Sequence, residues 1–271
     1  MKKKISITID ETTLTAIDEL VDNIIVRNRS QAIETLVSQA LKEEKIAVIL
    51  AGGSITSLKL DTKEFKFAAK VGEKTLLELA IEKLKEESFS KIYFVGQKQV
   101  LTRAFEILGD GSIYGASVEY LEEQDARGTA DTLRLLKGKL NKTFLVVYND
   151  IIFSQMDLYD LWTDHQRLKG AVTLMLTTTP NPERKGVAKL EGAKVLEFEQ
   201  KPAKSTVYLG FSSLFIAEPS LLDQQGKSLE TEIFPKLASR GLLFGHVTSQ
   251  QELHINSAAD LKKAAILLRK E

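Results

Sequence analysis

The sequence predicts an α/β protein built in two parts, and three observations support this. Residues 4–9 alternate between polar and apolar side chains, as a strand with one buried face does. Two segments with the 3.6-residue apolar period of amphipathic helices follow, up to residue 44. From Lys45 onward, short apolar strands alternate with amphipathic helices, which is typical of a Rossmann-like, mainly parallel sheet with helices on both faces. We therefore expect two domains, residues 1–44 and 45–271.

The N-terminal segment is expected to fold only as a pair of chains. Its strand carries isoleucines on one face and is followed by a helix opening at Asp10 and a second helix with Ser30 as its N-cap. A single strand leaves both edges unpaired, and so short a segment buries little surface. Pairing this strand with its copy from a second chain solves both problems, so we predict an obligate homodimer and leave open whether dimers pair into tetramers.

The second part is expected to begin with alternating strands and helices and to change to β-hairpins after Pro180. The expected strands are 46–50, 92–95, 118–121, 144–148, 171–177, 186–190, 194–199 and 207–216. The expected helices are 74–86, 100–108, 129–136, 156–167, 230–239 and 258–269.

Composition narrows the possible classes of protein. The chain has 271 residues, of which 43% are hydrophobic and 27% charged, with no cysteine and a formal net charge of zero. It is too apolar to be disordered, and no apolar run reaches the ~18 residues that a membrane span needs. The absence of cysteine excludes disulfides and thiolate metal sites and suits a reducing interior. We expect a cytoplasmic protein with no membrane partner.

Residues 1–44 resemble the ribbon-helix-helix repressors, through Lys-Lys-Lys-Ile-Ser-Ile-Thr-Ile and Arg-Asn-Arg-Ser. The resemblance implies that the paired ribbon enters the major groove of double-stranded DNA, where its outward side chains read bases. It also implies that the start of the second helix holds a phosphate. The DNA-binding residues would be Lys4, Ser6, Thr8, Arg27, Arg29 and Ser30. The alternative is dimerisation alone, because this segment carries six Lys and Arg residues against eight Asp and Glu residues.

A turn with two glycines, Ala51-Gly52-Gly53-Ser54, follows the first strand of the second part. Glycine lets the main chain approach an anion closely, so the turn suits a phosphate group. Further motifs follow in order: Lys66, then Gln124 with Gly128-Thr129-Ala130, then the strand ending at Asp150, then Glu199-Gln-Lys-Pro, and finally residues 254–260. Together these motifs resemble the sugar-1-phosphate nucleotidyltransferases, over roughly residues 45–271.

The resemblance implies a GT-A-like fold and a role for each matched residue. The nucleotide-binding residues would be Ala51, Gly52, Gly53, Ser54, Gln124, Gly128 and Thr129. Lys66 and Asp150 would be catalytic, Asp150 would also bind Mg²⁺, and Lys201 would meet the sugar phosphate. The reaction joins two highly charged groups, so cations must neutralise their repulsion.

The sequence departs from the motifs of this family at three positions that are expected to carry much of the chemistry. Ile55 replaces a glycine of the phosphate turn, Ser57 replaces its arginine, and His254 replaces the second metal-binding aspartate. Magnesium prefers oxygen ligands, so histidine suits it poorly and the metal site is expected to be incomplete.

We expect a DNA-binding regulator whose second domain senses a nucleotide or sugar nucleotide, with little or no turnover. The alternative is an active, divergent sugar-1-phosphate nucleotidyltransferase that uses residues 1–44 for dimerisation. A structural scaffold is the third hypothesis.

Overall fold

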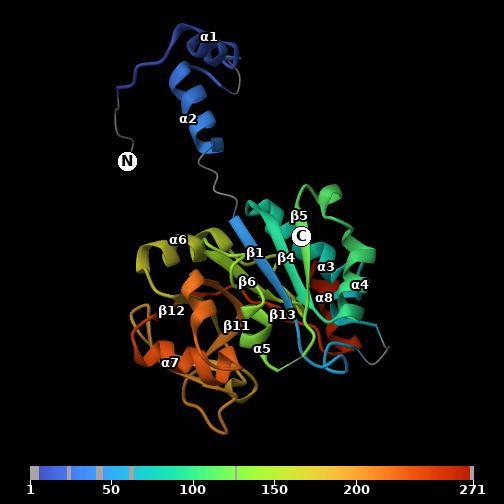
Figure 1. Ribbon diagram of the computed structural model, residues 1–271. Coiled ribbons are helices and arrows are strands. Elements are labelled where there is room, and N and C mark those ends of the chain that lie inside the picture. The colour runs from blue at the N-terminus through green and yellow to red at the C-terminus, as the bar shows by residue number, and fades with distance from the viewer. Residues whose placement is uncertain (1–5, 23–25, 41–44, 61–63, 126, 269–271) are drawn as a thin grey trace. The chain divides into compact units, whose positions relative to one another are not determined.

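The computed structural model describes residues 6–22, 26–40, 45–60, 64–125 and 127–268. The chain divides into two compact units, Met1–Glu44 and Lys45–Glu271, which are described separately below (Figure 1). Among the described residues, no helix has both the length and the apolar character that crossing a bilayer requires.

The first unit contains two helices, α1 (Glu11–Glu19) and α2 (Arg29–Ala40). Asp10 caps α1 by accepting a hydrogen bond of 2.9 Å from the Thr13 backbone N–H, as the sequence predicts. The hydroxyl groups of Thr12 and Thr13 also donate hydrogen bonds to the Asp10 carboxylate. Together these hydrogen bonds hold the pKa of Asp10 well below its ordinary value. Among the described residues of this unit, Ile17 and Ala32 are the buried apolar ones. Two buried side chains form a very small core, so the described part of the unit gains little from burial within one chain.

Three expectations about this unit need correction or lie outside the description. Ser30 is not the N-cap of α2: the helix begins at Arg29, and Asn28 accepts a hydrogen bond of 2.9 Å from the Gln31 backbone N–H. The predicted strand at 4–9 is not seen, because Ser6 to Ile9 join no ladder in the described part of the chain. Lys4 lies outside the described residues.

Of the predicted DNA-contacting residues that the structure describes, Arg29 is engaged in an ion pair within the unit. Ser6 and Thr8 are exposed, whereas the Arg29 guanidinium binds the Asp18 carboxylate, with an Nη2–Oδ2 distance of 2.6 Å. This contact raises the pKa of Arg29 and lowers that of Asp18. Arg27 is exposed, and its backbone N–H donates to the Gln31 side chain.

The second unit is organised around one nine-stranded sheet (Figure 1). Its strand order is β5-β4-β1-β6-β11-β8-β12-β10-β9. The strands are β1 (Lys45–Ala51), β4 (Phe89–Gly96), β5 (Ser117–Glu122), β6 (Phe144–Tyr148), β8 (Val172–Thr178), β9 (Gly186–Glu191), β10 (Lys194–Gln200), β11 (Leu209–Ala217) and β12 (Leu243–Thr248). Two small ladders lie apart from it: β2 (Lys70–Val71) with β3 (Lys74–Thr75), and β7 (Ile151–Ile152) with β13 (Leu253–His254).

The sheet is mixed, so the prediction of a mainly parallel, Rossmann-like sheet is wrong for its second half. β5, β4, β1 and β6 are parallel neighbours, whereas β11 is antiparallel to β6, β8 and β9. The pairing of β11 with β9 closes the strands β11, β8, β12, β10 and β9 into a small barrel. Antiparallel strands can be joined by short loops and need no helical crossover. The strands β9, β10 and β11 accordingly follow β8 with no α-helix between them.

Helices cover both faces of the sheet. They are α3 (Leu76–Glu86), α4 (Lys98–Leu108), α5 (Thr129–Arg134), α6 (Leu158–Leu168) and α7 (Phe234–Ser239). The last helix, α8 (Ala258–Leu268), packs on the small strands β2 and β13 instead. Side chains of α3, α4 and α6 pack with Ala47, Ile49 and Ala51 of β1, and those of α5 and α7 pack with Ile46, Val48 and Leu50. Both faces of β1 are thus covered, which explains why this strand is apolar from Ile46 to Ala51.

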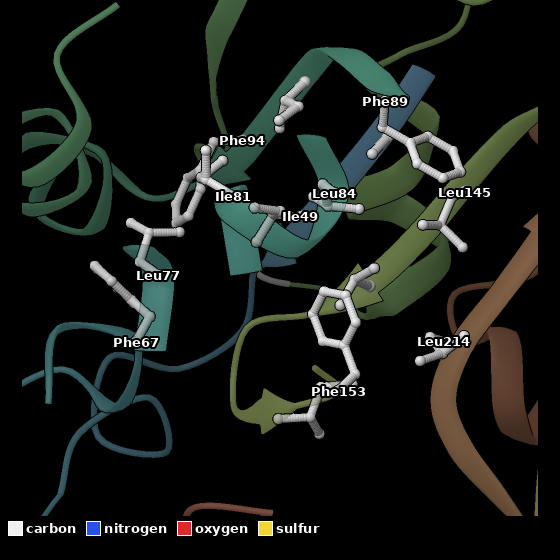
Figure 2. Close-up of a cluster of buried hydrophobic side chains, with 14 of the residues drawn as sticks. Ile49, Phe67, Leu77, Ile81, Leu84, Phe89, Phe94, Leu145, Phe153 and Leu214 are labelled. Carbon is white, nitrogen blue, oxygen red and sulfur yellow. The ribbon is translucent and has the colours of Figure 1, made fainter. Parts of the chain in front are cut away.

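Figure 2 shows the core on the first of these faces, where Ile81 and Leu84 of α3 approach Ile49 and Phe94 of the strands. All four side chains are buried. The predicted helix at 74–86 begins at Leu76 instead, because Thr75 and Glu78 form a capping box that fixes the first turn.

The predicted helix at 230–239 consists of two parts. Residues Leu229–Ile233 form a turn of π-helix, and α7 follows directly. A π-turn widens the helix by one residue and is often found where a side chain must be aimed at a site. Here it carries Glu230, which lines the cavity described next.

Candidate active site

The centre of the site is a lysine held by two side chains from distant parts of the chain. The Lys66 ammonium donates 2.7 Å to Asn256 Oδ1 and lies 3.4 Å from Asp150 Oδ2. Phe65 and Phe67 on either side of Lys66 are buried and stack on each other, so the short helix Lys66–Ala68 is fixed to the core. The structure thus brings together Lys66 and Asp150, the two predicted catalytic residues.

The ladder between β7 and β13 places His254 next to Asp150. His254 pairs with Ile151, and the Ile255 backbone N–H donates 2.9 Å to the Asp150 carbonyl. Residue 254 therefore does lie beside Asp150, as the resemblance implies. However, His254 Nε2 lies 3.2 Å from Glu252 Oε1.

Glu252 is a buried carboxylate with two cationic or proton-donating neighbours. Its side chain is 0% exposed, and its Oε1 accepts from Lys185 Nζ and contacts His254 Nε2. Burial alone would raise the pKa of Glu252, but the hydrogen bond from His254 and the charge of Lys185 outweigh it and lower this pKa to about 2. Glu252 is therefore ionised at neutral pH.

The partners of Lys66, Asp150 and Asn256, line one cavity of about 520 Å³ together with Glu252 and His254, and this volume suits a small-molecule ligand. Lys66 itself is not among the lining residues. Asp150, Glu230 and Glu252 supply its acidic lining, and Arg184, Lys185, Lys201 and His254 its basic lining. Among the described residues, the side chains of Arg184 and Lys201 have no ion-pair partner, so both charges remain available to an anion. Lys201, the predicted sugar-phosphate residue, has a backbone φ of 49°, a left-handed conformation that residues other than glycine rarely adopt.

The glycine-rich turn is arranged differently from the expectation of an open phosphate site. Ala51 is buried at the end of β1, and the Gly53 N–H donates 3.1 Å to the buried carboxylate of Glu123. A Cβ on Gly52 would lie 2.5 Å from Thr132 Oγ1, so only glycine fits there. Ser54 and Ser57, instead of an arginine, close the turn through the bond from Ser57 Oγ to the Ser54 carbonyl. The Gly53 N–H, one of the groups expected to bind phosphate, is therefore already hydrogen-bonded to Glu123.

The remaining predicted nucleotide residues lie outside the main cavity. Gln124 lines a smaller hollow of about 290 Å³ at the ends of β4 and β5. Gly128 and Thr129 pack against the chain segment at 227–230: the Ala130 N–H donates to the Lys227 carbonyl, and Thr129 Oγ1 donates 2.7 Å to Glu230. Glu230 therefore joins the start of α5 to the wall of the main cavity.

The residues present do not complete the expected Mg²⁺ site. Asp150 supplies one carboxylate, already in contact with the Lys66 ammonium, and the second position holds His254, which contacts Glu252. No three His, Asp or Glu side chains in the described part of the chain are grouped so that they could hold a metal ion. The donor set fits a cation-rich anion site better than a two-carboxylate magnesium site.

Several site residues received no role in the sequence analysis. Asn256 accepts a hydrogen bond from Lys66, Glu230 accepts hydrogen bonds from three hydroxyl groups, and Glu252 lines the cavity. Gln200 belongs to the Glu199-Gln-Lys-Pro motif, but the sequence analysis did not identify it as a residue of the site. Glu252 comes two residues before His254 in the closing motif, but only the fold brings its side chain to Lys185.

Comparison with known proteins places the second unit in a family. A model of the family described as "Nucleotidyl transferase" matches residues 46–250. A probable mannose-1-phosphate guanylyltransferase 1 of Oryza sativa subsp. japonica is 29% identical over 214 residues, which cover 74% of this chain and 58% of that protein. A mannose-1-phosphate guanylyltransferase of Mycobacterium tuberculosis is 30% identical over 146 residues, 51% of this chain and 41% of that protein. The chain spans little more than half the length of the first of these relatives.

A solved structure shares the fold. It comes from Bacillus anthracis, is described as a glucose-1-phosphate thymidylyltransferase, and was obtained in complex with a sucrose. Its TM-score is 0.73 at 24% identity, and the match covers 84% of this chain and 96% of that one. This likeness confirms the nucleotidyltransferase fold.

These matches contradict the expectation of a DNA-binding regulator with little or no turnover. The relatives named above are enzymes of nucleotide transfer, and the matched region includes Lys66, Asp150 and Lys201. The departures at Ile55, Ser57 and His254 led to that expectation. The structure offers a different interpretation of two of them, since Ser57 closes its turn and His254 contacts a buried glutamate.

Proposed function

The chain belongs to the nucleotidyl transferase family, and on that premise we propose that it is an active sugar-1-phosphate nucleotidyltransferase. It uses a nucleoside triphosphate and a sugar 1-phosphate to make a nucleotide sugar. A phosphate oxygen of the sugar phosphate attacks the α-phosphorus of the triphosphate. The new P–O bond forms as the bond to the bridging oxygen breaks, and pyrophosphate leaves with that electron pair.

The single observation that carries this proposal is a set of cations on and beside one cavity. Lys66 contacts Asp150 and Asn256, which both line the cavity. Arg184 and Lys201 line the same cavity and have no ion-pair partners among the described residues. Two polyanionic substrates repel each other, and fixed cations stabilise the charge that builds up in the transition state. Lys66 is assigned to the transferring phosphate, and Lys201 and Arg184 to the sugar phosphate.

The nucleotide is assigned to the ends of β1 and β4. The backbone N–H groups of Ser54 and Ile55 have no partner among the described residues and follow the glycine turn. The hollow at Gln97 and Gln124 lies nearby, since Gln97 Nε2 donates 2.9 Å to the Gly53 carbonyl. Amide side chains at this place suit the hydrogen-bonding edge of a base.

The first unit is proposed to pair two chains. Ile7, Leu20, Leu36 and Val37 are exposed by between 37% and 55%, which is much apolar surface for a unit with so small a core. A second copy would cover these side chains and pair the alternating residues 4–9. Sedimentation of the full chain tests this: Val37→Lys should give monomers, whereas Ile113→Lys, at an exposed position of the second unit, should not.

Release of pyrophosphate tests the enzymatic proposal. The full chain is incubated with each of the common nucleoside triphosphates and with glucose 1-phosphate or mannose 1-phosphate. We expect pyrophosphate and the matching nucleotide sugar in equal amounts, and loss of both with Lys66→Met. Absence of product in every combination would contradict the proposal.

A further inference from the structure

A buried ion pair links the two chain segments that carry much of the charged lining of the main cavity. The Glu252 side chain is 0% exposed, and its Oε1 accepts a hydrogen bond from the Lys185 ammonium. Lys185 directly precedes β9 of the barrel, and Glu252 directly precedes β13, which pairs with β7 beside Asp150. Among the described residues, no main-chain hydrogen bond joins the segments 180–185 and 249–254. This side-chain pair is therefore the hydrogen-bonded link between them.

On the barrel side, the main chain of Lys185 is tied to both cations that were assigned to the sugar phosphate. Its carbonyl accepts a hydrogen bond of 2.9 Å from the Lys201 N–H, and Arg184 is its neighbour in the chain. Arg184 and Lys201 line the cavity and have no ion-pair partner among the described residues. Any shift of Lys185 therefore changes where these two charges lie.

On the other side, the Glu252 carboxylate fixes the chain next to Asp150. The same Oε1 atom lies 3.2 Å from His254 Nε2. The β7–β13 ladder holds His254 beside Asp150, and the Ile255 N–H donates 2.9 Å to the Asp150 carbonyl. One carboxylate oxygen thus connects the barrel-side cations with the segment next to Asp150, whose side chain contacts Lys66.

The burial of this pair favours a role in geometry over a role in stability. Removing two charges from water costs nearly as much free energy as their attraction returns, so a buried ion pair adds little net stability over apolar side chains of the same size. Its hydrogen bond is directional and stronger than one between neutral groups, so it fixes the position of the two groups that it joins. At a cavity for two polyanions, such a fixed position decides how the remaining cations face the substrates.

We propose that Lys185 and Glu252 are positioning residues: their ion pair holds Arg184 and Lys201 at the distance from Asp150 at which the sugar phosphate meets the triphosphate. This inference rests on the proposed function, because it takes Arg184 and Lys201 as the residues that bind the sugar phosphate. Neither member of the pair is assigned a contact with the reacting atoms. A displacement of about 1 Å in a bound group can lower a rate by about 100-fold, so loss of the pair should appear in the rate of transfer.

Steady-state pyrophosphate release by the full chain tests this, with the triphosphate and the hexose 1-phosphate varied separately. The variants are Lys185→Met, Glu252→Gln and the two together. We expect each single variant to lower kcat by roughly 10- to 100-fold and to raise the KM for the sugar phosphate, because the cations have shifted. The KM for the triphosphate should stay within about twofold, because the glycine turn makes its contacts with Gln97 and Glu123. The double variant should be no slower than the slower single variant, because residues that act as one unit are not additive.

The β9–β10 hairpin supplies a matched control. Lys189 Nζ lies 3.4 Å from Glu197 Oε1, and both side chains are more than half exposed. Lys189→Met with Glu197→Gln removes an ion pair of the same type and should leave kcat and both KM values unchanged, because exposed pairs contribute little. Lys185→Arg keeps a charged donor for Glu252 and should retain most of the rate.

A purely structural role predicts a different result. It would lower the unfolding temperature and the folded fraction, while kcat per folded molecule and both KM values would stay those of the wild type. Circular dichroism of each sample gives the folded fraction. If Glu252→Gln does not fold, Lys185→Met still allows the test, because the Lys185 side chain is 22% exposed. Wild-type kcat and KM values per folded molecule in Lys185→Met would overturn the proposal.

Calorimetry with glucose 1-phosphate and mannose 1-phosphate separates this inference from the proposed function. A wild-type chain that releases pyrophosphate no faster than Lys185→Met overturns the inference and leaves the activity intact. A wild-type chain that releases none, but binds a hexose phosphate at least about tenfold more tightly than Lys185→Met does, refutes the activity and supports the positioning of the cations. Equal affinity of both chains without any release of pyrophosphate refutes both.

Discussion

Replacing Gly128 with alanine should destabilise the second unit, because the backbone of Gly128 lies directly against the backbone of Lys227. Gly128 is the N-cap of α5, with φ 149° and ψ 166°. A Cβ at this position would lie 2.3 Å from the Lys227 carbonyl oxygen and 2.9 Å from its carbon. Real Cβ atoms do not approach a carbonyl so closely, so either α5 or the segment at 227–230 must move.

The expected cost has two parts. The backbone conformation is one that glycine alone adopts readily, and an alanine there costs about 1–3 kcal/mol. Displacing backbone to make room adds about 1–3 kcal/mol, as for other overpacked sites. Gly138→Ala is the control, since Gly138 also has a positive φ, 83°, but has nothing within 4 Å of a Cβ. It should lose only about 1 kcal/mol of stability.

Urea unfolding followed by tryptophan fluorescence measures the difference. The chain has one tryptophan, Trp162, which is buried in the second unit, so the signal reports that unit alone. We expect Gly128→Ala to be less stable than Gly138→Ala by at least about 1 kcal/mol. It should also weaken binding of triphosphate, because Thr129 and its bond to Glu230 move with α5. Equal stability of the two variants would refute the steric argument.

Three further predictions concern the site and the core. Lys66→Met should lower kcat by roughly 10²–10³ with little change in stability, as measured by pyrophosphate release, whereas Lys70→Met on the exposed β2 should not. Because the folded pKa of Glu252 lies near 2, below its ordinary 4.5, its contribution of about 3 kcal/mol is complete above pH 4.5 and is lost as the pH falls toward 2. Acid unfolding should show this loss, and a chain with Glu252→Gln should lack that part of the pH dependence. Ile81→Ala, at a fully buried site of α3, should cost about 2–5 kcal/mol in urea unfolding, and a loss below about 1 kcal/mol would contradict the packing described for that face.

The sequence predicted the parallel half of the sheet well, because its central strands β1 and β6 carry continuous apolar runs at 46–51 and 144–147. The strand 144–148 was placed at its exact bounds, and the apolar positions of 74–86 and 100–108 marked two of the covering helices. The barrel could not be predicted in this way. Its closure depends on one long-range pair, Gly210 with Val187, which leaves no periodic signal.

The same distinction applies to the site. Lys66, Asp150 and Lys201 were found because they stand in motifs, and the structure gathers them around one cavity or its edge. Asn256 and Glu252 act through contacts with residues far away in the chain, Lys66 and Lys185 respectively. Such pairs can be seen only after the fold has joined β7 to β13. The prediction of a regulator failed because substitutions at three motif positions were taken as loss of activity.

Strand β11 is hydrogen-bonded to three strands, β6, β8 and β9. It therefore joins β6, the strand that ends just before Asp150, directly to the barrel, which carries Gln200 at the end of β10 and is preceded by Lys185 at the start of β9. A domain hinge needs a flexible joint between its two halves, and here the joint is a paired strand. The proposed function therefore implies that a substrate enters past the segments 180–185 and 249–252, while the ladder keeps Asp150 and Gln200 at a fixed spacing.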